Sequence, residues 1–199
     1  MNAQEIPTIL IAYPKDFACY GKFERKVSSI LSNLSGYHLA FLSDDNELIE
    51  RYASSDSRVL DSLLQVDERQ IEEGITHAIL FDDGNTYGNL MGDIEKRGIK
   101  SRVINAGLTK VVNIDRGEKC DMYIGRGSKW GNPYAVGFDG NDRDEAIRKF
   151  RYDFDRGFLK FSKEDALELK GKTLGCYCKP AACHGDVLAE YLNALDDGA

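Results

Sequence analysis

The chain has 199 residues and a net charge of −7, with 42% hydrophobic and 30% charged residues. This length fits one or two domains, and the composition excludes wholesale disorder. No apolar run approaches the roughly 20 residues that span a bilayer. The N-terminus lacks the basic and apolar regions of a signal peptide. We therefore expect a cytoplasmic protein without a membrane partner, located in the host cytoplasm if the source is viral.

The acidic excess lies almost wholly in the first half of the chain. Residues 1–106 carry 11 Lys and Arg against 17 Asp and Glu, whereas residues 107–199 carry 15 against 16. Neither half has the basic stripe that neutralises duplex phosphates, so we expect no extended duplex DNA-binding surface. Three of the five cysteines fall within eight residues. This spacing makes a poor disulfide framework and favours a reducing compartment.

The first 105 residues alternate between expected strands and helices. Apolar runs at 8–12, 37–43, 76–81 and 101–105 are typical of buried strands. Helical pieces are expected over residues 23–34, 48–53 and 59–73, the last with Gly74 as its C-cap, and a loop and helix over 85–98. This alternation predicts an α/β domain over residues 1–106, a Rossmann-like parallel sheet with helices on both faces.

The loop after the third expected strand is a candidate ligand site, because parallel sheets bind ligands beyond the carboxyl ends of their strands. It reads Asp82-Asp-Gly-Asn-Thr-Tyr-Gly-Asn. Asp83, Asn85 and Thr86 are its candidate binding residues, since glycines and small polar residues let backbone N–H groups approach a phosphate or ribose. Plain turn chemistry explains the same residue types equally well.

Residues 107–199 change character and predict a smaller α/β (α+β) domain. Strands are expected at 109–114, 122–124 and 172–178, and helices at 142–161, 166–169 and 186–195. Asp142, followed three residues later by Glu145, is close to a capping box. In a strand over 172–178, Cys176 and Cys178 would share one face.

A glycine-rich loop in this second half reads Arg126-Gly-Ser-Lys-Trp-Gly-Asn-Pro133. Arg126 and Lys129 are candidates to hold a phosphate. Trp130 and the Tyr134 that follows the loop are candidates to stack on a base, and Asn132 to bind the edge of that base. Ser128 belongs to the same candidate substrate-binding group. The alternative is that Trp130 is a core residue and that the glycine and proline shape a turn.

A second loop reads Cys176-Tyr-Cys178-Lys-Pro-Ala-Ala-Cys183-His184-Gly-Asp186. As a catalytic site, it offers the Cys183 thiol at a helix N-terminus, His184 as an acid or base and Asp186 to orient the imidazole. As a metal site, it offers Cys176, Cys178, Cys183 and His184, ligand types that Zn²⁺ prefers. A third interpretation treats the cysteines as small buried hydrophobes. The catalytic interpretation requires no cofactor, and zinc enters only with the metal interpretation.

Residues 111–192 resemble the bacterial and bacteriophage domain of unknown function 4326. The resemblance rests on residues 124–126, on 128–133 and on the complete cysteine loop from Gly175 to Asp186. It implies a phage or mobile-element context but no reaction. Residues 7–105 resemble the SLOG superfamily of Rossmann-like domains in nucleotide-processing and nucleotide-sensing proteins, through residues 8–13, 48–53 and 78–88.

Both resemblances imply a nucleotide. We therefore expect a protein that acts on a nucleotide, nucleoside or nucleic-acid base, as a hydrolase or transferase that cleaves or transfers an N-glycosidic bond. The alternative is a non-enzymatic accessory factor that binds a nucleotide signal or a host protein. In that case the Cys/His cluster would be structural, with or without zinc.

Overall fold

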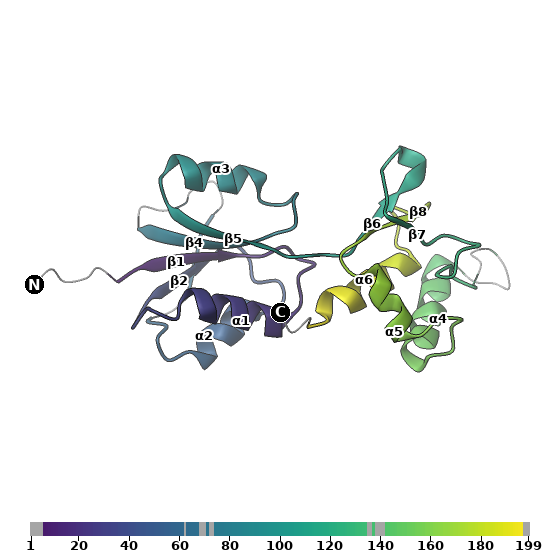
Figure 1. The fold of residues 1–199 in the computed structure, drawn as a ribbon, viewed down its shortest axis with the longest axis horizontal. Coiled ribbons are helices and arrows are strands. Elements are labelled where there is room, and N and C mark those ends of the chain that lie inside the picture. The colour runs from purple at the N-terminus through teal and green to yellow at the C-terminus, as the bar shows by residue number, and fades with distance from the viewer. Residues whose placement is uncertain are drawn as a thin grey trace, which may run out of the picture. The chain divides into compact units, whose positions relative to one another are not determined.

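The structure is a computed structural model that describes residues 6–61, 63–67, 71, 74–134, 137 and 142–196. The chain divides into two compact units, Met1–Ala106 with Asp196–Ala199, and Gly107–Leu195. Each unit has a parallel sheet of its own (Figure 1). No helix within the described ranges is long and apolar enough to cross a bilayer.

The first unit is built on a five-stranded parallel sheet in the order β3-β2-β1-β4-β5, as the alternating pattern predicts. Its strands are β1 (Thr8–Ala12), β2 (His38–Phe41), β3 (Leu64–Gln65), β4 (Ile75–Asp82) and β5 (Lys100–Asn105). Its helices are α1 (Tyr20–Ile30), α2 (Leu48–Ser55) and α3 (Gly88–Lys96). Figure 1 shows α3 on one face of the sheet and α1 with α2 on the other. The predicted Rossmann-like fold class is confirmed.

Alternation along the central strands gives this sheet two apolar faces. Leu10 of β1 and Leu80 of β4 belong to a buried cluster with Leu90 of α3. On the other face, the ring of Phe81 stacks on that of Phe23 from α1 at 5.3 Å between centroids. Because both faces are covered, the strands read as continuous apolar runs rather than as alternating ones.

The prediction of a helix over residues 59–73 is wrong for those residues of this range that the structure describes. Val59 forms an isolated parallel bridge with Tyr37, and Leu64–Gln65 pairs with β2 as the edge strand β3. Edge pairing satisfies the backbone groups of this segment, which outweighs its helix-like apolar spacing. Gly74, at φ 137°, directly precedes β4 and does not follow a described helix. Residues 62, 68–70 and 72–73 lie outside the described residues.

The second unit has a three-stranded parallel sheet in the order β6-β8-β7. Its strands are β6 (Lys110–Asn113), β7 (Met122–Tyr123) and β8 (Thr173–Cys176). Its helices are α4 (Arg143–Arg156), α5 (Lys163–Ala166) and α6 (His184–Ala194), with single 3₁₀ turns at Ile114–Arg116 and Leu167–Leu169. A smaller α/β unit is therefore present, as the sequence predicts.

The helix expected over 142–161 and the strand expected over 172–178 are both shorter than expected, and the helix expected over 166–169 is α5 followed by a 3₁₀ turn. The helix over 142–161 ends at Arg156, because Gly157 at φ 73° takes the left-handed conformation that closes a helix, even though apolar spacing continues to Phe161. Its start is as expected, since the Asp142 carboxylate accepts from the backbone N–H of Glu145 at 2.8 Å. The last strand ends at Cys176, so Cys178 lies in the following turn and not on the strand.

A partly buried network that joins the end of α2 to the residue before β2 is expected to make the first unit sensitive to acid. The Asp56 carboxylate accepts from Arg58 at 2.7 Å and from the Tyr37 hydroxyl at 2.7 Å. The guanidinium of Arg58 is the main cause that holds the pKa of Asp56 well below its ordinary value, while burial of the carboxyl opposes this shift. A depressed folded-state pKa stabilises the fold above the unfolded pKa and loses that contribution as the pH falls.

We expect Asp56→Asn to lower the free energy of unfolding by about 2 kcal/mol near neutral pH, because hydrogen bonds to a charged group are lost. The difference from the unchanged protein should shrink as the pH falls below about 4, where the carboxylate of the unfolded chain begins to protonate. Urea unfolding at several pH values measures it. A deficit that stays constant down to about pH 2 would contradict the role of ionised Asp56.

Candidate functional site

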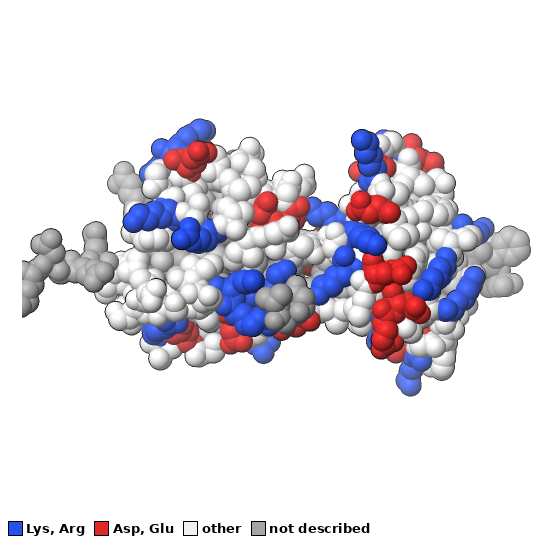
Figure 2. Space-filling model, viewed as in Figure 1, with Lys and Arg blue, Asp and Glu red and all other residues white. Residues whose placement is uncertain are grey.

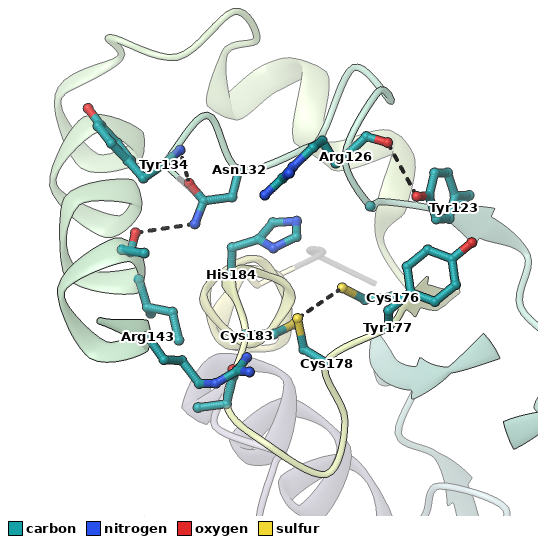
Figure 3. A pocket seen from close by; sticks show the side chains of 14 residues that line it. Tyr123, Arg126, Asn132, Tyr134, Arg143, Cys176, Tyr177, Cys178, Cys183 and His184 are labelled. Carbon is teal, nitrogen blue, oxygen red and sulfur yellow. Dashed lines mark hydrogen bonds between the residues drawn. The ribbon is translucent and has the colours of Figure 1, made fainter. Parts of the chain in front are cut away.

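A cavity of about 390 Å³ opens at the carboxyl ends of β7 and β8 in the second unit. The first turn of α4 and the N-terminus of α6 complete its wall (Figure 3). It is lined by Tyr123, Gly125, Arg126, Asn132, Tyr134, Arg143, Ala146, Ile147, Cys176, Tyr177, Cys178, Ala182, Cys183 and His184. Ligands of parallel sheets bind at this edge, where loops and helix N-termini converge.

The charge of the cavity is positive. Arg126 points toward its centre in Figure 3, and no hydrogen bond or ion pair holds the Arg126 guanidinium among the residues described. Arg143, from the first turn of α4, donates to the carbonyl of Ala182 at 3.1 Å and keeps further N–H groups for a ligand. None of the side chains that line the cavity within the described ranges is acidic. Such a site selects anions.

Two tyrosines form one wall of the cavity. The rings of Tyr123 and Tyr177 meet edge to face, with centroids 6.0 Å apart, and Tyr177 is 53% exposed. The Tyr123 hydroxyl donates to the carbonyl of Arg126 at 3.3 Å. It passes so close to Gly125 that a Cβ there would overlap the ring. Glycine at 125 therefore lets Tyr123 hold the loop that carries Arg126.

Three thiols lie together on the floor of the cavity. The Sγ atoms of Cys176, Cys178 and Cys183 lie within 4.8 Å of one another, and Cys176 and Cys178 are 3.7 Å apart. Cys176 ends β8, Cys178 lies in the turn that follows, and Cys183 is the N-cap of α6. A turn with a hydrogen bond from Ala181 N–H to the Cys178 carbonyl folds this segment back on itself. The cysteines thus meet although they belong to three local structures.

The thiols differ in acidity because they contact one another. A hydrogen bond from Cys183, helped by the backbone N–H of Cys178, lowers the pKa of Cys176 to about 5, against the opposing effect of burial. The same contact with Cys176, together with burial, raises the pKa of Cys183. Burial also raises the pKa of Cys178. Of the three thiols, Cys176 therefore has the lowest pKa, whereas the sequence points to Cys183 as the nucleophile.

His184 is 6% exposed, and its Nε2 lies 2.9 Å from the carbonyl oxygen of Ile124. Burial lowers the pKa of this imidazole, so the ring is neutral near neutral pH. A carbonyl only accepts, so Nε2 carries the proton and Nδ1 keeps its lone pair. Gly185 permits this close fit, because a Cβ there would lie 2.5 Å from the Ile124 side chain.

Asp186 has contacts other than the expected one with His184. One carboxylate oxygen accepts from the backbone N–H of Cys183 at 2.9 Å, and the other lies 2.6 Å from the Lys179 Nζ. The N–H of Gly185 in turn donates to the Cys183 sulfur at 3.2 Å. Asp186 thus caps the first turn of α6 and is not among the residues that line the cavity.

Some side chains of the glycine-rich loop line the cavity, and others pack elsewhere in the fold. Arg126 and Asn132 line the cavity, whereas Ser128, Lys129 and Trp130 do not. Trp130 is 2% exposed and packs edge to face on Phe161 at 4.8 Å. Lys129 forms an ion pair with Asp165 at 2.9 Å. The Ser128 hydroxyl accepts from the Trp130 backbone N–H. These three side chains fix the loop in the fold.

Of the three candidates of the first unit, Thr86 lines a second cavity, and Asp83 and Asn85 are not among its lining residues. Thr86 lines a cavity of about 700 Å³ together with Lys15, Asp45 and Asp67, at the carboxyl ends of β1, β2 and β4. Asp83 accepts from the backbone N–H groups of Asn85 and Thr86 at 3.0 and 2.8 Å. Those two amides are therefore engaged within the turn itself.

Three lining residues with polar groups in their side chains were not predicted from the sequence: Tyr123, Tyr177 and Arg143. For Arg143 a signal exists in the sequence. A positive side chain in the first turn of a helix opposes the helix dipole, so its presence directly after the cap Asp142 indicates a second role. The tyrosines carry no comparable signal, because a tyrosine beside a strand is an ordinary packing residue.

Comparisons with known proteins agree with this division of the chain. Residues 6–112 match the model of the minimal SLOG domain, and residues 109–194 match that of a domain of unknown function, DUF4326. A 12.4 kDa uncharacterised protein from the nrdA-td intergenic region of Enterobacteria phage T4 is 41% identical over 90 residues, 44% of this chain and 81% of the phage protein.

A second viral relative, an uncharacterised protein of Acanthamoeba polyphaga mimivirus, is 29% identical over 97 residues, 40% of this chain and 72% of that protein. No solved structure matches this chain. The SLOG match associates the first half with nucleotide-related function, and the viral relatives agree with the phage relationship that the cysteine motif implies. The chain belongs to the minimal SLOG family through residues 6–112, and it continues into a DUF4326 domain over residues 109–194.

Proposed function

We propose that this protein binds a nucleotide in the cavity of its second unit and acts on it there. The observation that carries the proposal is the pairing of two guanidinium groups, Arg126 and Arg143, in a cavity whose described lining has no acidic side chain. A guanidinium binds a phosphate through two parallel hydrogen bonds, which a carboxylate in the same cavity would oppose. Membership of the SLOG family supports a nucleotide as the source of that phosphate.

The tyrosine wall supplies a surface for the rest of the ligand. Tyr177 is half exposed and stands beside Tyr123, so its ring face is open to an unpaired base. On the face shown in Figure 2, basic side chains are interspersed with acidic ones and form no continuous stripe. This supports a single nucleotide or an unpaired base as the ligand, and not a duplex.

The reaction that we propose is cleavage or transfer of the N-glycosidic bond. In hydrolysis, the bond between C1′ and the base nitrogen breaks, the oxygen of water bonds to C1′, and the base leaves with a proton. In transfer, an incoming base nitrogen takes the place of water. The neutral imidazole of His184 and the Tyr123 hydroxyl are the groups of the cavity that can move that proton.

We expect 5′-monophosphates to bind more tightly than the matching nucleosides by roughly ten- to a hundredfold, since charge-assisted hydrogen bonds contribute about 1.5–3 kcal/mol. Isothermal titration of the full chain with both forms of each nucleoside measures this difference. Equal affinities would overturn the phosphate site. Chromatographic detection of the free base after incubation tests the reaction, and tight binding without base release would favour the accessory-factor alternative.

A further inference from the structure

The three thiols on the cavity floor have the spacing that a tetrahedral metal ion requires. Two thiolates at the usual Zn–S distance of about 2.3 Å lie about 3.8 Å apart when the metal is tetrahedral. The Sγ atoms of Cys176 and Cys178 are 3.7 Å apart, and Cys183 Sγ lies within 4.8 Å of both. The three sulfur atoms therefore need only small movements to surround one ion.

One sulfur atom has a backbone N–H donor, and N–H groups lie beside the other two. The backbone N–H of Gly185 donates to the Cys183 sulfur at 3.2 Å. The backbone N–H of Cys178 and the guanidinium of Arg143 favour the ionised forms of Cys176 and Cys178, respectively. Metal ligands are characteristically oriented by such outer partners, and thiolates need them to spread their negative charge. Small buried hydrophobes would need no such donors.

The described residues supply three ligands to this cluster and no fourth. All three cysteines line the cavity, and within the described residues no other Cys, His, Asp or Glu joins their cluster. His184, the fourth ligand that the sequence suggests, has no ring nitrogen within 4.8 Å of all three sulfur atoms. Zinc sites with three protein ligands keep the fourth position for water or a substrate, whereas structural sites are closed by four.

We propose that Cys176, Cys178 and Cys183 bind one Zn²⁺ as thiolates, with the fourth coordination position open to the cavity. Three thiolates and Zn²⁺ have a net charge of −1, which the nearby Arg143 balances. Zinc is preferred to a hard cation such as Mg²⁺ or Ca²⁺, because sulfur ligands select soft or borderline metals. The proposal does not depend on a nucleotide, and it makes the floor of the cavity a metal centre.

The test is a titration of the reduced, metal-free full chain with Co²⁺ under anaerobic conditions, followed by displacement with Zn²⁺. We expect one Co²⁺ per chain, thiolate-to-cobalt absorption bands and the visible spectrum of a tetrahedral ion. Azide added to the cobalt form should change that spectrum, because it enters the open position. A folded chain that binds no Co²⁺ would overturn the site, and a spectrum unaffected by azide would overturn the open position.

Variants assign the ligands. Cys183→Ser should lower the affinity by more than the roughly ten- to hundredfold that loss of an outer-shell partner costs, while serine keeps the helix cap. Cys120→Ser is the matched control, a partly buried cysteine outside the cluster, and it should bind normally. His184→Asn should keep three-thiolate binding. If His184→Asn lowered the affinity for the metal as much as Cys183→Ser does, the proposed set of three ligands would be wrong. Circular dichroism establishes that each variant is folded, and no nucleotide is present, so the outcome is separate from the nucleotide proposal.

Discussion

Replacement of Arg126 by alanine is expected to weaken nucleotide binding by roughly ten- to a hundredfold, the equivalent of about 1.4–2.8 kcal/mol. The guanidinium has no hydrogen bond or ion pair within the described part of the chain, and it points into the cavity (Figure 3). Its removal would therefore take away the proposed phosphate contact without breaking a hydrogen bond or ion pair that the described residues show. Isothermal titration measures the change in affinity, and thermal unfolding should be the same as for the unchanged protein.

Arg148→Ala is the matched control for this experiment. Arg148 lies on the exposed side of α4, forms an ion pair with Glu145 at 2.7 Å and does not line the cavity. This variant changes the net charge equally, so it separates a local contact from a general electrostatic effect. If both variants weakened binding to the same extent, Arg126 would have no specific role and the proposed phosphate site would be wrong.

Trp130→Ala is expected to lower the free energy of unfolding of the second unit by about 3–5 kcal/mol, the usual cost of deleting a large buried aromatic side chain. The indole is 2% exposed and packs against Phe161, so the substitution leaves a cavity in the core. Urea unfolding followed by far-UV circular dichroism measures the loss without relying on tryptophan fluorescence.

Phe158→Ala serves as the control for that measurement. Phe158 is 68% exposed, and exposed substitutions usually change stability by less than about 0.5 kcal/mol. A Trp130→Ala protein of unchanged stability that fails to bind nucleotide would contradict the core assignment. It would return Trp130 to the base-stacking role that the sequence analysis considers.

The sequence predicts the first sheet well where a strand is buried on both faces. Runs such as that of β1 have only one compatible structure in a parallel sheet, because helices cover both sides. The prediction for residues 59–73 is wrong because the strand in this segment is not buried. Its described strand is two residues long and exposed, so its pairing with β2 depends on a partner distant in sequence and leaves no periodic signal.

The sequence predicts which residue types form the candidate site, but not which way each of their side chains points. The loops of Arg126 and of Cys183 carry residue types that suit a pocket, and the structure places both side chains on one cavity. Local sequence could not show that Trp130 faces the core while Arg126 faces the cavity, because a glycine-rich loop has no fixed period. It also could not show that Asp186 caps α6, since a capping carboxylate and a catalytic one look alike in sequence.

The backbone amide of Gly185, in the first turn of α6, is sensitive to the chemical state of the cavity. The N–H of Gly185 donates to the Cys183 sulfur, so the charge on that sulfur acts directly on one backbone proton. In a ¹H–¹⁵N spectrum, the resonance of this single amide should register whether the sulfur is a thiol, a thiolate or bound to a metal. A change in the chemical state of the three thiols therefore alters an amide in the first turn of α6, where uniform ¹⁵N labelling follows it without any substitution.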